Sequence, residues 1–147
     1  MCFVAILFSG LLVGAVLHAQ TPECAVCPGF KIGPSAARKV TCLSDAEMAA
    51  HTATRKPVIQ TGLNEPRLSL HGTVAACLCF SRGGKVTRID ILSGHAMLQE
   101  FVLESLKKWT FVPVSKGGKN YGGCGRLRVH VEMDDGATSS TLETGNQ

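Results

Sequence analysis

The stretch from His95 to Trp109 constrains the fold most, because its apolar residues recur with the period of a helix. The side chains on this repeat are Leu98, Phe101, Val102, Ser105, Leu106 and Trp109. Their spacing predicts a helix of about four turns with one buried stripe, which makes Trp109 a core residue. We expect Ser93 to cap its start, and Lys107 and Lys108 to complement the partial negative charge of its last carbonyl groups.

Alternating apolar residues on either side of this helix predict three β-strands. Thr73 to Phe80 alternates, Ser81 to Gly84 has the composition of a turn, and Lys85 to Leu92 returns as the second strand of a hairpin. A third strand is expected over Leu127 to Met133, after a loop rich in Gly and Lys. The expected fold is therefore α+β, a small antiparallel three-stranded sheet with one main helix packed on one face.

Side chains alternate along a strand, so each strand divides its residues between two faces of the sheet. If Val74, Leu78 and Leu127 face the helix, the residues of opposite parity face away from it. The residues expected on this helix-free face are Cys77, Cys79, Cys124, Arg126, Arg128 and His130. The cysteines suggest that an amino-terminal arm covers part of this face.

Three motifs are shared with a known family: Gly72-x-Val74, Ile91-Leu92-Ser93-Gly94-His95 and Lys108-Trp109-x-Phe111-x-Pro113. Through them the chain resembles, over roughly its middle 60 residues, the carboxy-terminal domain of TonB and its stand-alone relatives. The resemblance implies the strand order second, first, third, with the third strand at an edge. It also implies that this edge binds a short segment of an outer-membrane transporter by strand addition.

The resemblance assigns the peptide-binding edge to Arg126, Leu127, Arg128, Val129, His130 and Val131. The competing interpretation is that charged side chains protect this edge from pairing, since charges are a usual defence of edge strands. The protecting residues would be Arg126, Arg128, His130 and Glu132.

The remaining segments divide the chain by composition. Residues 1–19 contain an apolar run over residues 3–17 and are expected to be a signal peptide, with a short anchor in the inner membrane as the alternative. Residues 20–66 are expected to form a cysteine-containing arm with one or two short helices, for which Ser44 and Glu47 offer a start signal. Residues 67–133 are the TonB-like domain, and residues 134–147 are polar and expected to be a disordered tail.

The chain has seven cysteines, and removal of Cys2 with the signal would leave six. An even number in an exported small domain favours disulfides and an oxidising compartment, the periplasm or cell envelope. If the first and third strands are antiparallel neighbours, Cys79 and Cys124 meet on the helix-free face. Cys77 is then left to reach one of the three arm cysteines, which are Cys24, Cys27 and Cys42.

Cys24 and Cys27 also have the spacing of a redox pair or of half a zinc site, the latter completed by Cys42 or His51. Structural disulfides are the favoured interpretation, and no cofactor or metal is expected. The net charge of +4 is scattered along the chain, which gives nucleic-acid binding little support. No catalytic constellation is visible. We therefore expect a non-enzymatic module for a protein or peptide partner, with a disulfide-stabilised envelope scaffold as the alternative and a redox or metal protein as a weaker one.

Overall fold

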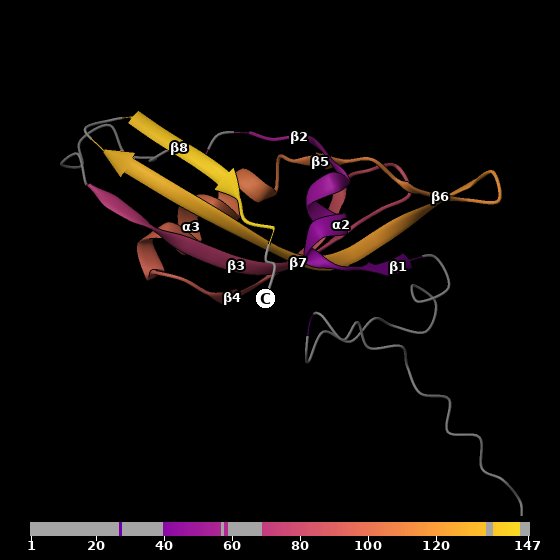
Figure 1. Ribbon diagram of the computed structural model, residues 1–147, viewed down its shortest axis with the longest axis horizontal. Coiled ribbons are helices and arrows are strands. Elements are labelled where there is room, and N and C mark those ends of the chain that lie inside the picture. The colour runs from indigo at the N-terminus through magenta and orange to yellow at the C-terminus, as the bar shows by residue number, and fades with distance from the viewer. Residues whose placement is uncertain (1–26, 28–39, 57, 59–68, 135–136, 145–147) are drawn as a thin grey trace, which may run out of the picture.

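The computed structural model describes residue 27, residues 40–56, residue 58, residues 69–134 and residues 137–144. Within them lie strands β1 (Val40–Leu43), β2 (Thr52–Thr54), β3 (Leu70–Phe80), β4 (Val86–Ser93), β5 (Thr110–Phe111), β6 (Val114–Lys116), β7 (Lys119–Asp134) and β8 (Ala137–Leu142), and helices α2 (Asp45–Ala50) and α3 (Ala96–Leu106). Most of the described residues are in strands, and the two helices are short (Figure 1).

The prediction of a three-stranded sheet is wrong, because the sheet has six strands. Its main path runs β1-β7-β3-β4, and β6 and β8 also pair with β7. The three predicted strands are present as β4, β3 and β7, but β7 begins at Lys119 rather than near Leu127. This length gives β7 room for several partners: β1 pairs parallel with Gly122–Gly125, and β8 pairs antiparallel with Val129–Asp134.

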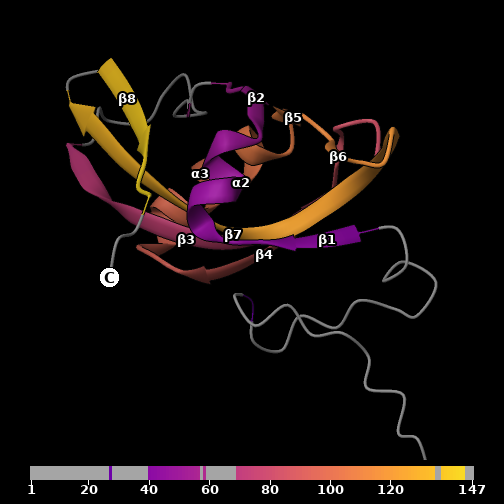
Figure 2. The same cartoon turned by 45° about the vertical axis from the view of Figure 1, so that its right-hand side comes forward.

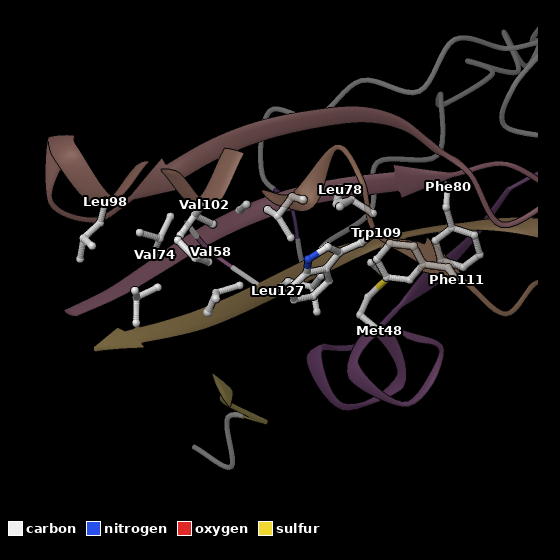
Figure 3. Packing of buried hydrophobic residues seen from close by; sticks show 14 of the residues in the cluster. Met48, Val58, Val74, Leu78, Phe80, Leu98, Val102, Trp109, Phe111 and Leu127 are labelled. Carbon is white, nitrogen blue, oxygen red and sulfur yellow. The ribbon is translucent and has the colours of Figure 1, made fainter. Parts of the chain in front are cut away.

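The core lies between this curved sheet and the two helices, which occupy its concave side (Figure 2). Leu98, Val102 and Leu106 of α3 are fully buried, as the helical period predicts. Trp109 is 2% exposed and lies in the same cluster as Met48 of α2 and Leu127 of β7 (Figure 3). The prediction that Trp109 is a core residue is confirmed.

The start of α3 differs from the prediction. Its N-cap is His95 rather than Ser93, and no side chain caps it. Gly94, with φ of 134°, stands between Ser93 and the helix, and a β-carbon there would meet Val74. This close approach of the backbone to β3 fixes where the helix begins.

The segment expected to hold one or two short helices holds one, α2, and the strands β1 and β2 on either side of it were not expected. The predicted signal at Ser44 is confirmed: the Glu47 backbone N–H donates to Ser44 Oγ, and the Ser44 N–H donates to Glu47 Oε2 at 2.7 Å, a complete capping box. The β-branched residues Val40 and Thr41 before it favour a strand, and pairing with β7 provides one.

The expected disordered tail is also wrong for part of its length, since residues 137–142 form β8. Residues 1–26, with the predicted signal peptide or anchor, lie outside the described residues, as does most of the predicted arm. In the part of the chain that the structure describes, neither helix is long and apolar enough to cross a membrane.

Candidate peptide-binding edge

The six residues assigned to the peptide-binding edge all lie on β7, and they alternate as predicted. Leu127 and Val129 are 1% exposed and Val131 is fully buried, all within the core. Arg126, Arg128 and His130 have the opposite parity, and their side chains are 32%, 37% and 33% exposed. The segment therefore presents one apolar face and one cationic face.

The outer side of this segment is not a bare edge, which corrects the strand arrangement that the resemblance implied. β8 pairs antiparallel with it, placing Leu142 opposite Val129, Thr141 opposite His130 and Ser140 opposite Val131. The Glu143 N–H continues the contact by donating to the Arg128 carbonyl oxygen at 3.0 Å. Half of the predicted binding edge is thus occupied by the chain's own carboxy-terminal strand.

A short interval of β7 separates its two outer neighbours. The pairing of β1 ends at Gly125, and that of β8 begins at Val129. Because α2 starts two residues after β1 ends, its first turn lies beside this interval. Asp45 in that turn is buried, and the Nε–H of Arg126 is shared between its two carboxylate oxygens, with N–O distances of 2.9 Å to Oδ2 and 3.2 Å to Oδ1. Arg128 Nε lies 3.8 Å from the same carboxylate. Two guanidinium groups therefore share one acid here.

The end of β8 is held on the helix-free face by a small polar cluster. Thr73 Oγ1 donates to Glu143 Oε1 at 2.9 Å and lies 3.1 Å from His130 Nδ1. A hydroxyl has one proton, so the Nδ1 atom of His130 must be the donor to Thr73. His130 Nε2 lies 3.6 Å from Glu132 Oε1. This cluster ties β3, β7 and the residue after β8 together.

The side chains of β8 contribute little to its attachment. Ser139 and Thr141 are exposed, and Leu142 is the β8 side chain that packs against the core. The strand is consequently held mainly by its main-chain hydrogen bonds and by Glu143. A peptide with larger apolar residues at alternate positions would bury more apolar surface along the same edge.

Two disulfides join pairs of described residues on the face of the sheet away from α3. Cys79 stands directly opposite Cys124 in the β3–β7 register and is bonded to it, which is the pair expected from strand parity. Cys77 is bonded to Cys27, so one arm residue is fastened to the middle of β3. These cysteines form a second buried cluster, against which Val40 packs. Disulfides of this kind indicate an oxidising, exported location.

The bonding of Cys27 to Cys77 contradicts the interpretation of Cys24 and Cys27 as a redox pair, because Cys27 is already bonded elsewhere. Cys42 is disulfide-bonded as well, which removes it as a zinc ligand. His51 turns Nδ1 to the Val112 carbonyl oxygen at 2.7 Å. No cluster of three His, Cys, Asp or Glu side chains suited to a metal occurs within the described residues.

Sequence reasoning missed three parts of this region: β8, the ion pairs of Asp45, and a groove between the β3–β4 turn and the β6–β7 hairpin. The groove is lined mainly by apolar atoms, with Arg82, Lys119 and Tyr121 on its walls. The Ser44 capping signal could have placed Asp45 in a first helical turn, but only the register of β1 brings that turn to β7.

No protein-family model matches the chain, and no curated protein matches it.

Proposed function

We propose that this protein is an exported, non-enzymatic interaction module that binds an extended peptide as an added strand along β7. The observation that carries the proposal is the pairing of β7 with β8, in which this edge already binds a mostly polar strand through its main chain. Main-chain pairing provides affinity in strand addition, and pockets for alternate side chains provide specificity. The proposed binding residues are Arg126, Leu127, Arg128, Val129, His130 and Val131.

The proposed partner is a segment of an outer-membrane transporter, as in the TonB-dependent systems that the motifs around Trp109 resemble. The charge at the edge favours an acidic segment, because Arg126 and Arg128 share one carboxylate, that of Asp45, among the described residues. The peptide replaces β8 at Val129–Val131 and extends beside Arg126–Arg128. The periplasm or cell envelope is the proposed compartment, in keeping with the disulfides.

The test compares the full chain with a form that ends at Asp134 and therefore lacks β8. Each is titrated with synthetic segments of outer-membrane transporters while backbone amide signals of Arg126 to Val131 are followed by nuclear magnetic resonance. The shortened form should bind an acidic segment more tightly, with protection from exchange of the Arg126, Arg128 and His130 amides, which lie on the side that faces β8 in the full chain. A matched peptide with proline at alternate positions cannot complete the ladder and should not bind.

Two results would contradict the proposal. One is a folded shortened form that binds no transporter segment; the other is binding that leaves the amides of Arg128 and His130 unchanged, since the backbone groups of these residues face β8. If the shortened form does not fold, Leu142→Ser in the full chain loosens the apolar contact of β8 and provides the same comparison.

A second function, a disulfide-stabilised envelope scaffold, is favoured by the protection of the same edge. β8 covers one part of β7, and Asp45 with the two arginines covers the next. Under this alternative, the amides of β8 exchange slowly in the full chain, and removal of β8 causes aggregation without selective peptide binding.

A further inference from the structure

β4 forms the margin of the sheet on the side away from β1 and β8 (Figures 1 and 2). It pairs with β3 on its inner side, and Lys85, just before it, forms an isolated antiparallel bridge with Thr110 of β5. Along Val86–Ser93 itself, no second strand among the described residues pairs with β4. An edge strand of eight residues presents a row of main-chain donors and acceptors that can pair with another strand.

The side chains of β4 are divided between the two faces of the sheet. Ile89 and Ile91 are partly buried and pack against the core. Arg88 and Asp90 alternate with them on the other face, where Arg88 Nη2 lies 2.8 Å from Asp90 Oδ2. Both charged side chains retain substantial exposure, 49% and 41%. Two opposite charges thus stand two residues apart around Ile89.

We propose that β4 is a dimerisation edge that pairs antiparallel with β4 of a second copy of this chain. The two-fold axis passes through Ile89, perpendicular to the sheet, and the two sheets become continuous. In this register Arg88 stands opposite Asp90 of the second copy, and Asp90 stands opposite its Arg88. Opposite charges on directly opposed strand residues stabilise pairing. The charge pattern of β4 is therefore complementary to itself.

Neighbouring two-fold registers are selected against by the same charges. An axis through Arg88 would oppose two arginines, and an axis through Asp90 would oppose two aspartates; both arrangements are destabilising. A register that places residues of different parity opposite each other would put the apolar face of one copy on the same side of the continuous sheet as the polar face of the other. The register through Ile89 avoids both problems and places the two Ile89 side chains side by side on the core face.

Apolar surface near this edge supports a second copy as the occupant. Leu92 at the end of β4 is 44% exposed, and Met97 in the first turn of α3 is 41% exposed. These are two of the three large apolar side chains that stay exposed among the described residues. Dimerisation at β4 leaves the outer side of β7 accessible, so this inference is independent of peptide binding.

Analytical ultracentrifugation of the oxidised protein tests the inference. The wild-type protein should sediment as a dimer at micromolar concentration, and R88D and D90R should each raise its dissociation constant by roughly tenfold or more, since each opposes like charges at two symmetric positions. R82D makes the same charge change in the turn before β4 and should leave the dimer intact.

The decisive measurement mixes the two single variants. Each variant carries like charges at positions 88 and 90, so two copies of the same variant repel each other. R88D and D90R, in contrast, place opposite charges against each other at both positions. The mixture should form a heterodimer although the Arg88 to Asp90 pair within each chain is lost. A monomeric wild-type protein, single variants that dimerise as well as the wild type, or a mixture that stays monomeric would each overturn the proposal. An extended peptide that binds β4 of a monomeric protein would likewise overturn it.

Discussion

Asp45 and Arg126 are joined at the edge of β7, with the Nη2 atom of Arg126 2.9 Å from Asp45 Oδ2 and the Nε atom in contact with both carboxylate oxygens. The Asp45 side chain is 9% exposed, and that of Arg126 is 32% exposed. This pair fixes the start of α2 against a strand that is 81 residues further along the chain. It links the packing of the amino-terminal helix to the surface proposed to bind peptide.

Asp45→Asn removes the charge that both arginines share and weakens a hydrogen bond between charged groups. We expect a loss of about 1.5 to 3 kcal/mol in the free energy of unfolding, measured by urea denaturation. Glu104→Gln is the matched control, because it neutralises a carboxylate in the exposed pair with Lys107 and should change stability little. Equal losses of stability from the two substitutions would show that the Asp45 carboxylate contributes no more to folding than an exposed one.

Replacement of Cys79 and Cys124 together by alanine opens a loop with a sequence separation of 45 residues. The chain-entropy model gives a loss of about 4 kcal/mol, which a lower melting temperature of the oxidised protein would register. Peptide mapping without reductant should recover Cys79 linked to Cys124 and Cys27 linked to Cys77. A fragment linking Cys77 to Cys79 would contradict the β3–β7 register.

Trp109 contributes a buried indole and a hydrogen-bond donor. Its Nε1 lies 3.0 Å from the Lys56 carbonyl oxygen and 3.0 Å from Ser105 Oγ, and Ser105 Oγ donates to the same carbonyl at 2.6 Å. Trp109→Ala should cost about 3 to 5 kcal/mol by thermal or urea unfolding. Trp109→Phe keeps most of the apolar surface and loses the donor, so it should cost less. A melting curve that barely moves in Trp109→Ala would contradict the burial of this side chain.

Gly84 turns the chain between β3 and β4 with φ of 78°, and a β-carbon there would collide with the Phe111 carbonyl group. The Phe111 N–H in turn donates to the Gly84 carbonyl oxygen at 2.8 Å. Gly84→Ala should therefore destabilise the protein by more than about 1 kcal/mol, since both strain and a clash result. Gly83→Ala is the control, because its nearest neighbour is Ser81 Oγ at 3.7 Å. Similar melting temperatures for the two variants would refute this account.

The spacing of apolar residues predicted those helices and strands whose own sequence repeats with a helical or strand period. The stripe on α3, the hairpin of β3 and β4, and the alternation of β7 all follow from residue spacing, and so does the meeting of Cys79 with Cys124. β8, which pairs with the outer side of β7, has no such signal. Residues 137–141 are small and mostly polar, and they become a strand because β7 supplies hydrogen-bonding groups along its outer side.

The candidate site shows the same limit. Side-chain alternation placed Arg126, Arg128 and His130 on one face, yet it could not reveal that β8 lies beside them. Nor could it reveal Asp45, because the contact depends on the parallel register of β1, in which Leu43 stands opposite Gly125. Long-range pairing is set by geometry between distant segments, which local composition does not encode.

The capping box of α2 makes the stability of this helix depend on pH. The Ser44 backbone N–H and the Ser44 hydroxyl both donate hydrogen bonds to the Glu47 carboxylate. They lower the pKa of this carboxyl below its ordinary value, and the backbone donor has the larger effect. A lowered pKa in the folded state means that the ionised form is the one that folding favours. The stability that the Glu47 carboxylate contributes is therefore complete above the ordinary pKa of glutamate and is lost as the pH falls through the lower, folded-state pKa.

Titration of the Glu47 carboxyl by nuclear magnetic resonance should show this lowered pKa, and Ser44→Ala should reverse part of the shift, since the backbone donor remains. Ser44→Thr keeps both donors and serves as the control. If Ser44→Ala titrates like the wild-type protein, the hydroxyl has no part in holding Glu47.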